Sequence, residues 1–171
     1  VGTYTKQASE GIYSFILDAD KGEITDVKVA ARVDNPTYLT ISEDRTNLYS
    51  VVKEGESGGV AAFAIKPESG ELTLLNTDVE AGSPPCHLST DQEKSFLFTA
   101  NYHKGTVNVY SIHQENGAVG EKVAEAQHTG SGPDPRQEKP HTHFAGKTLD
   151  GKYLVAVELG SDQVIVYQVG Q

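Results

Sequence analysis

Two histidines separated by a single residue, His141 and His143, form the pair best suited to chemistry in this sequence. Alternate residues of a β-strand project from the same face, so the two imidazole rings would lie side by side as a general base and its orienting partner. The structural alternative is about equally common: one histidine caps the turn after Pro140 and the other makes a buried hydrogen bond. The pair follows the one long insertion in an otherwise regular chain, and this position favours the functional interpretation.

Glu158 lies near the end of an apolar run, residues 155–159. Ionisation of a carboxyl group in such a strand is costly without a partner, so we expect a raised pKa, which would suit a general base. Glu158 could also join His141 and His143 as the third ligand of a metal ion. The structural alternative is a salt-bridged strand end in solvent.

Two further residues could contact a substrate. Asn101 could donate its amide N–H to a carbonyl group or an oxyanion, although an asparagine before the turn at residues 104–105 also has an ordinary structural role. Arg136, within the insertion at residues 129–139, could bind a phosphate or carboxylate group, whereas most such arginines are simply solvated.

The remaining histidines and the single cysteine are assigned by context. His87 stands directly after Cys86, and adjacent strand residues point to opposite faces, so we do not expect a Cys–His nucleophile pair. The other three histidines lie in polar, turn-like segments, and we expect them at the surface: His103, His113 and His128.

The framework that must position these residues is repetitive. Ile12, Val60, Val107 and Val164 open similar stretches at steps of 48, 47 and 57 residues, and the longer last step contains the insertion. A period of about 40 to 50 residues built from several short strands is typical of β-propeller blades.

One full unit, residues 35–80, contains four strand-like runs separated by turn-forming residues. In the third run Val60 and Ala62 face one way while Phe63 faces the other, so both faces are apolar, as in a sheet packed between two others. No segment has a sustained helical pattern. The expected strands are residues 38–42, 48–53, 60–66 and 72–79, and residues 55–59 are expected to form a turn.

Alignment of the units places the candidate residues in two columns. The start of the innermost strand holds Tyr38, His87 and His143, and the end of the second strand holds Lys53, Asn101 and Glu158. Innermost strands line the central channel of a propeller, so side chains from different blades converge there. Packing would favour the same residue in every blade, and the differences within these columns therefore indicate a site.

We therefore predict an all-β fold, a β-propeller of about three and a half four-stranded antiparallel blades. The predicted divisions are a partial, three-stranded first blade at residues 1–34, a second blade at 35–82, a third at 83–130, and the insertion with a partial fourth blade at 131–171. Two faces and edges would remain open.

The overall charge limits the classes of partner. A net charge of −10 and a pI near 5.0 argue against a nucleic-acid partner, whereas a few focused cations could still hold a small anion. No apolar run approaches the roughly 20 residues of a membrane span, so we expect no membrane partner and a cytoplasmic location.

Four motifs together suggest a family. They are Gly2-Thr3-Tyr4-Thr5, Pro85-Cys86-His87-Leu88-Ser89, Ala100-Asn101-Tyr102, and His141-Thr142-His143 followed by Asp150-Gly151-Lys152-Tyr153-Leu154. In these segments the chain resembles the seven-bladed β-propeller 6-phosphogluconolactonases, which share their fold with fungal carboxy-muconate lactonising enzymes. The resemblance runs the whole length of the chain and implies the N-terminal half of a seven-bladed ring, with a C-terminal half as its partner.

The resemblance also implies an activity. It is the hydrolysis of 6-phospho-D-glucono-1,5-lactone, a small anionic sugar lactone, to 6-phosphogluconate in the pentose phosphate pathway, with no metal or cofactor. His143, or Glu158 acting through it, would deprotonate the attacking water, and His141 with Asn101 would stabilise the oxyanion. His87 and Arg136 would bind substrate, with Arg136 at the phosphate.

Three alternatives remain open at this level. The same site could lactonise a muconate. The propeller could instead be a non-catalytic platform for protein interactions. Finally, the protein could be a metal-dependent lactonase that uses His141, His143 and Glu158 as ligands.

Overall fold

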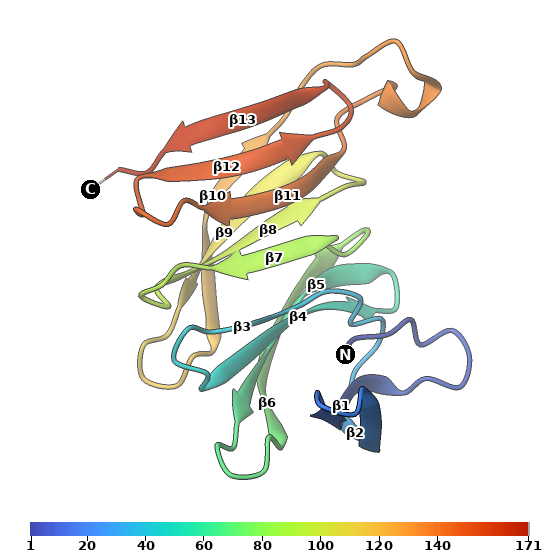
Figure 1. Cartoon of the computed structure of the whole chain (residues 1–171). Coiled ribbons are helices and arrows are strands. Elements are labelled where there is room, and N and C mark those ends of the chain that lie inside the picture. The colour runs from blue at the N-terminus through green and yellow to red at the C-terminus, as the bar shows by residue number, and fades with distance from the viewer. Residues whose placement is uncertain (171) are drawn as a thin grey trace.

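The computed structural model describes residues 1–170 and is built almost entirely of β-strands (Figure 1). Within these residues thirteen strands form four antiparallel sheets, and the one helix is a short 3₁₀ turn, η1 (Pro135–Gln137), in the insertion. The predicted all-β fold with almost no helix is confirmed. In chain order the sheets contain β1 (Gly11–Asp18) and β2 (Glu23–Arg32); β3 (Leu39–Ile41), β4 (Asn47–Glu54), β5 (Ser57–Ile65) and β6 (Leu72–Ala81); β7 (His87–Thr90), β8 (Phe96–Asn101), β9 (Thr106–Ile112) and β10 (Val119–Gln127); and β11 (Thr142–Lys147), β12 (Tyr153–Glu158) and β13 (Gln163–Gln168).

The second sheet is packed on both faces, which accounts for its two-sided apolar pattern. On one side of β5, Val60 and Ala62 are buried in a cluster with Leu97 of the third sheet. On the other side, Phe63 is buried in a cluster with Ile12 of the first sheet. Burial of a side chain of this size contributes about 1.5–3 kcal/mol. The pattern predicted for residues 60–66 is therefore confirmed.

The innermost strands of three sheets lie beside one another. Strand β7 contacts β3 on one side and β11 on the other, and each of the three is the first strand of its meander. Sheets whose first strands converge in this way are arranged as propeller blades, as predicted. The blade divisions after residues 34, 82 and 130 remain a proposal, which the extents of the sheets support.

The blades have two ends that differ chemically. We call one the strand-start end, because β3, β7 and β11 begin there, and it also carries the β4–β5, β8–β9 and β12–β13 turns. The opposite turn end carries the turns that follow β3, β7 and β11. In Figure 1, β7 and β11 run from right to left, so the strand-start end lies at the right, where the insertion also lies.

Two details of the predicted strands were wrong. Residues 57–59 continue β5, so the turn there is shorter than expected. A Cβ atom on Gly59 would lie 1.9 Å from the Asp78 carbonyl oxygen, so glycine here lets β5 and β6 approach closely instead of forming a turn. The first sheet has two strands rather than three, and Val1 adds only a reciprocal backbone contact with Tyr13, in which the Tyr13 N–H donates to the Val1 carbonyl oxygen at 2.8 Å.

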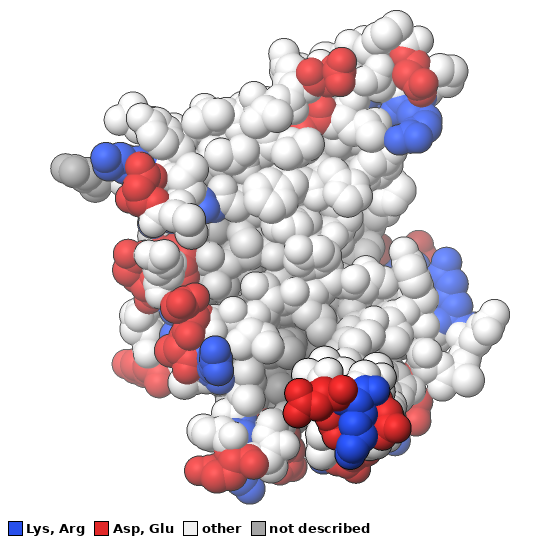
Figure 2. Space-filling view, viewed as in Figure 1, with Lys and Arg blue, Asp and Glu red and all other residues white. Residues whose placement is uncertain are grey.

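The first and last sheets each leave an apolar face uncovered, as expected. In the last sheet Val164 and Val166 are 66% and 57% exposed, and in the first sheet Leu17 is 60% exposed. Exposed faces of this kind mark surfaces that bind another element. Figure 2 shows another area without charged side chains in the middle of the visible surface, over the region of β3, β7 and β11. In the described residues, no helix is long and apolar enough to cross a membrane.

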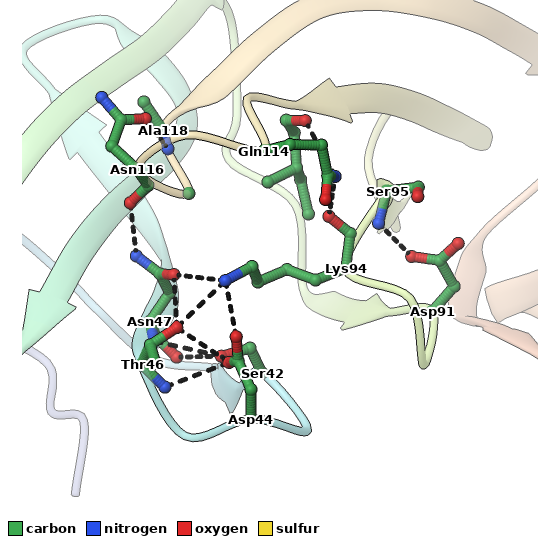
Figure 3. A network of polar contacts seen from close by, with 12 residues as sticks. Ser42, Asp44, Thr46, Asn47, Asp91, Lys94, Ser95, Gln114, Asn116 and Ala118 are labelled. Atoms are coloured by element: carbon green, nitrogen blue, oxygen red, sulfur yellow. Dashed lines mark hydrogen bonds and ion pairs between the residues drawn. The ribbon is translucent and has the colours of Figure 1, made fainter.

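A polar network at the turn end ties the second and third sheets together (Figure 3). The Lys94 ammonium lies 2.7 Å from a carboxylate oxygen of Asp44 and 3.2 Å from the amide oxygen of Asn47. The Lys94 ammonium is also the main reason why the pKa of Asp44 lies well below its ordinary value. We call this group the turn-end clasp; it consists of Ser42, Asp44, Thr46, Asn47, Lys94 and Asn116.

Candidate active site

His87 lies at the start of β7, between two aromatic rings from the neighbouring blades. The ring centroids of Tyr38 and Phe144 are each 4.5 Å from that of His87. The Ala145 N–H donates to His87 Nδ1 at 3.4 Å, so the proton of the neutral ring lies on Nε2. Burial, together with the charge of nearby His143, lowers the pKa of His87 from 6.5 to about 4. At neutral pH His87 is therefore an uncharged imidazole.

The Nε2–H group of His87 is available to a ligand. It has no hydrogen-bond partner among residues 1–170. It is also not one of the side-chain atoms there that are both unpaired and inaccessible to solvent, so a ligand can reach it. A neutral imidazole held by ring packing on both sides can donate a hydrogen bond to a carbonyl oxygen without moving. The structure therefore supports a substrate-binding role for His87.

His143 is exposed and sits on a β-bulge at the start of β11. Thr142 pairs with Glu158 and Phe144 pairs with Val157, so His143 is the extra residue of the strand. The prediction that His143 aligns with His87 was wrong by one residue, because this bulge moves Phe144 into the position beside His87. His143 instead faces the ring of Tyr102, with an edge-on centroid separation of 6.1 Å.

His141 is buried and both of its ring nitrogens are occupied. Its ring stacks on Tyr102 with centroids 4.2 Å apart, and Nδ1 donates to the Tyr102 carbonyl oxygen at 2.9 Å. Its Nε2 lies 3.2 Å from both carboxylate oxygens of Glu138, and this contact is the main reason why the pKa of Glu138 is lowered. His141 therefore orients Tyr102 and the end of the insertion, and the expectation that it binds an oxyanion is not supported.

Glu158 lies at the centre of a buried hydrogen-bond network. Its carboxylate accepts hydrogen bonds from the Thr142 hydroxyl at 2.7 Å, from His128 Nδ1 at 2.9 Å, from the Gly160 N–H at 2.9 Å and from the His141 N–H. Tyr167 completes the network, with its hydroxyl 2.6 Å from His128 Nε2. A neutral His128 that donates from Nδ1 and accepts from Tyr167 satisfies every group.

The environment of Glu158 contradicts the expected general base. Burial alone would raise its pKa, but the hydrogen bonds from His128, Thr142 and two backbone N–H groups outweigh burial, and the pKa is lowered. The carboxylate contacts neither solvent nor His143 among the described residues. Glu158 is therefore a positioning residue that fixes the backbone at the start of β11.

His128 was predicted at the surface, and that prediction was wrong. It is 6% exposed, because it fills the position between the last two sheets where Glu158 needs a hydrogen-bond donor. His103 and His113 are exposed, as expected. A buried carboxylate requires a hydrogen-bond donor. The one signal in the sequence that could have pointed to His128 was therefore Glu158, a carboxylate in an apolar strand with no evident partner.

Asn101 has the turn-forming role that was its structural alternative. Its amide oxygen accepts hydrogen bonds from the His103 and Lys104 N–H groups at 3.1 and 2.9 Å, and its amide nitrogen donates to the Ser83 carbonyl oxygen at 2.9 Å. It is 5% exposed. Asn101 therefore shapes the loops of the strand-start end and is not available as the predicted oxyanion donor.

Arg136 lies in a different region from the histidines. It is exposed on η1, where its backbone N–H donates to the carboxylate of the N-cap residue Asp134 at 2.8 Å. It lines a surface depression with Asp134 and Asp162, two carboxylates that would repel a phosphate group. Of the other predicted site residues only Glu158 borders this depression.

A separate cavity of about 330 Å³ opens at the strand-start end beside the histidines. Tyr102 forms part of its wall and also contacts the rings of His141 and His143. Cys86 forms another part, and its thiol lies 3.8 Å from the His143 carbonyl oxygen. Burial raises the pKa of the Cys86 thiol, which makes it a poor nucleophile, as expected.

The three-ligand metal site considered for His141, His143 and Glu158 does not form. Within residues 1–170 no group of three or more His, Cys, Asp or Glu side chains has a geometry that could hold a metal ion. The side chain of Glu158 is turned toward His128, and that of His141 toward Tyr102 and Glu138.

Comparison with known proteins gives a consistent result. The family model described as "Lactonase, 7-bladed beta-propeller" matches residues 1–171. The chain is 51% identical to the 6-phosphogluconolactonase of Bacillus subtilis over 169 residues. The aligned region covers 99% of this chain and 48% of that protein. The chain spans about half the length of the curated relatives it matches.

Solved structures agree with the sequence relatives. The structure of a protein from Lactobacillus plantarum is 41% identical, with a TM-score of 0.90, over 99% of this chain and 48% of that one. The periplasmic gluconolactonase of Pseudomonas aeruginosa is 31% identical, with a TM-score of 0.90, over 98% of this chain and 48% of that one.

Proposed function

The chain belongs to the seven-bladed β-propeller lactonase family, and from this premise we propose that the protein hydrolyses 6-phospho-D-glucono-1,5-lactone to 6-phosphogluconate. The name of the Bacillus subtilis relative, 51% identical, supports this substrate. The observation that carries the proposal is the neutral, ring-packed His87 with a free Nε2–H, near enough to the exposed His143 for the charge of His143 to affect its pKa. Hydrolysis of an ester-like carbonyl requires one such donor and one base.

In the proposed reaction His143 takes a proton from a water molecule as the water oxygen attacks the lactone carbonyl carbon. An imidazole is the side chain best suited to this role near neutral pH. The Nε2–H of His87 donates to the carbonyl oxygen, which becomes an oxyanion in the tetrahedral intermediate. The bond between that carbon and the ring oxygen then breaks, the ring oxygen receives the proton from His143, and the product is the open-chain acid.

Two predicted catalytic residues act indirectly in this scheme. The Glu158 carboxylate accepts hydrogen bonds from the backbone N–H groups of His141 and Gly160. These bonds fix the start of β11 and with it the bulge that carries His143. His141 stacks on Tyr102, the ring against which His143 lies. Both are therefore positioning residues for His143 rather than groups that touch the substrate.

We further propose that additional blades complete the ring, as a C-terminal half of the propeller. The chain covers 48% of the Bacillus subtilis relative, and the exposed apolar faces of its first and last sheets are the surfaces such blades would cover. A cytoplasmic location remains part of the proposal, since the lactone arises where sugar phosphates are oxidised.

The proposal is tested by measuring lactone hydrolysis with the intact protein, meaning the complete gene product that carries these residues. Fresh 6-phosphogluconolactone is mixed with the protein, and release of 6-phosphogluconate is followed through 6-phosphogluconate dehydrogenase. We expect a rate well above the spontaneous one, both with and without a chelator. A rate equal to the spontaneous one would refute the proposal.

Two other results of the same assay would point to the alternatives. Activity that disappears with the chelator would indicate a metal-dependent lactonase, with ligands other than the three residues considered. No hydrolysis, combined with turnover of a carboxy-muconate, would indicate the lactonising reaction instead. Inactivity toward both substrates would leave the propeller as an interaction platform.

A further inference from the structure

Unpaired cations gather at one place in this acidic protein. The chain has a net charge of −10 and 14 lysine and arginine residues. Within residues 1–170, nine of these 14 form ion pairs with carboxylates. The other five are Lys6, Arg45, Lys53, Arg136 and Lys139. Of these, Lys6 and Lys53 line the 330 Å³ cavity at the strand-start end, and Lys139 donates to the carbonyl oxygen of His103, a third residue of its wall.

The lining of this cavity suits an anion. It contains no aspartate or glutamate, and it adds the side chains of Tyr4, Thr37 and Tyr102 to the two lysines. The neighbouring Asp34 does not line the cavity, and its carboxylate accepts a hydrogen bond from the Thr5 hydroxyl. Two lysines in the wall of a concave site without a carboxylate create a local positive potential that opposes the overall charge.

Hydrogen bonds hold the backbone at Lys53 and directly before Lys6. Lys53 belongs to β4, where it pairs with Gly58 and its N–H donates to the Asp34 carbonyl oxygen at 3.0 Å. Lys6 follows Thr5, which exchanges two hydrogen bonds of 3.1 Å with Asn35. The N-terminal segment is therefore tied to the loop that leads into β3, and Lys6 is held at the rim of the cavity.

The cavity borders the proposed reaction centre. Tyr102, in its wall, also contacts the ring of His143, and the thiol of Cys86, in its wall too, lies 3.8 Å from the His143 carbonyl oxygen. A sugar derivative with an anionic group in the cavity would extend its other end toward the two histidines. In the proposed substrate the phosphate arm and the reacting carbonyl flank the same ring oxygen, so the two groups can occupy two adjoining regions at once.

We propose that the cavity lined by Lys6 and Lys53 is the phosphate subsite of the enzyme. This inference rests on the proposed function for the identity of the substrate, whereas the anion site itself rests on the two lysines. Lysine binds phosphate as a compact charge with three donors, and a hydrogen bond between ionised groups is among the stronger ones. Arg136 was expected to bind the phosphate, but it lies beside the carboxylates of Asp134 and Asp162. We therefore assign phosphate binding to Lys6 and Lys53.

The test compares phosphorylated and unphosphorylated lactones with the intact protein. The variants are K6Q and K53Q, with R136Q as the rival phosphate ligand and K152Q as a matched control of equal charge change at the turn end. We expect K6Q and K53Q each to raise KM for 6-phosphogluconolactone about 10-fold or more, and to leave hydrolysis of glucono-1,5-lactone unchanged. R136Q and K152Q should change neither substrate's KM.

A second measurement separates failure of the subsite from failure of the proposed activity. Binding of 6-phosphogluconate and of inorganic phosphate is measured by ³¹P NMR titration, without turnover. Binding that is lost in K53Q but kept in R136Q would support the subsite even in a protein that hydrolyses no lactone. Equal losses for both lactones, an effect in R136Q alone, or unchanged phosphate binding in K6Q and K53Q would each overturn the inference.

Discussion

At the turn end Lys94 is surrounded by acceptors from the neighbouring sheet, whereas at the strand-start end Lys53 lines a cavity that contains no carboxylate. The same contrast holds for neutral donors. The Asn47 amide in the clasp reaches the Asn116 carbonyl oxygen at 3.0 Å, while the Nε2–H of His87 has no partner among the described residues. The polar groups of the clasp are satisfied, whereas at the strand-start end the Nε2–H of His87 and the side chains of the cavity lysines have no hydrogen-bond partner among the described residues.

The contrast shows how a repeated scaffold divides its tasks. A satisfied polar group stabilises the join between blades, because removing its partner would leave a desolvated charge or dipole. An unsatisfied group costs stability and is retained only where it serves another purpose, such as binding a ligand. Substitutions of the free groups at the strand-start end should therefore change activity, and substitutions in the clasp should change stability.

The largest effect is expected at the strand-start end. Replacing His143 by Ala removes the proposed base, and we expect turnover of 6-phosphogluconolactone to fall by about two to four orders of magnitude. The melting temperature should change little, because His143 is exposed on a bulge. The matched control is H113A, an exposed histidine at the turn end, which should retain full turnover. Equal rates for H143A and the wild type would remove His143 from the mechanism.

Glu158 sharpens the comparison, because it lies at the strand-start end but is fully hydrogen-bonded. We expect E158A to lower the free energy of unfolding by about 3–5 kcal/mol, since it leaves His128, Thr142 and two N–H groups without their acceptor. Denaturant unfolding of E158A beside E138A, which alters an exposed carboxylate, measures this difference. A fully stable but inactive E158A would restore Glu158 as a catalytic residue.

A smaller effect is expected in the clasp. Lys94 donates to three acceptors, and its side chain is 15% exposed, so K94M should lower the free energy of unfolding by about 1–2 kcal/mol. Turnover of the folded protein should not change. K152M serves as control, because Lys152 is exposed and its ion pair with Asp150 is 4.0 Å long. A loss of turnover in K94M at unchanged stability would break the division between the two ends.

The smallest expected effects are on the pH dependence of stability, which should differ between His87 at the strand-start end and Asp44 at the turn end. The pKa of His87 falls from 6.5 to about 4 on folding, so its contribution to stability is complete above about pH 6.5 and is lost as the pH falls toward 4. Because the pKa of Asp44 is lowered by Lys94, its contribution is present above its ordinary value of 3.8 and is lost only at lower pH.

Chemical denaturation across this pH range tests both statements. H87F should remove roughly 1 kcal/mol of the decline between pH 6.5 and 4, a value reduced for the partial exposure of the ring. D44N should flatten only the decline at lower pH. An H87F variant that keeps the wild-type profile from pH 6.5 to 4 would show that His87 is not the group that titrates there.

The repeated framework could be predicted because each blade carries its own evidence. The alternation of Val60, Ala62 and Phe63 follows from the period of a strand, and glycine and asparagine mark most turns. Gly58 and Gly59 misled the turn prediction, because glycine also serves where two backbones approach closely. Sequence alone does not distinguish the two uses.

The site was harder to predict, because its contacts join residues that are distant in the chain. His128 lies 30 residues from Glu158 and 39 from Tyr167, in a segment that reads as a polar turn. The bulge at His143 has no marker in the sequence, although it decides which ring lies beside His87. Alignment of the repeats placed Lys53 at the same position as Asn101 and Glu158. Lys6, in contrast, reaches the same cavity only through the contact between Thr5 and Asn35.

The most direct test of the central claim compares one variant from each end, H87F and K94M, in the intact protein. Phe keeps the ring packing of His87 and removes the Nε2–H donor, while Met keeps the length of Lys94 and removes its charge. We expect H87F to lower kcat for 6-phosphogluconolactone by about 10²–10³ with little change in melting temperature, and K94M to lower the melting temperature at unchanged kcat. The reverse pattern, or unchanged kcat in H87F, would contradict the assignment of chemistry to the strand-start end.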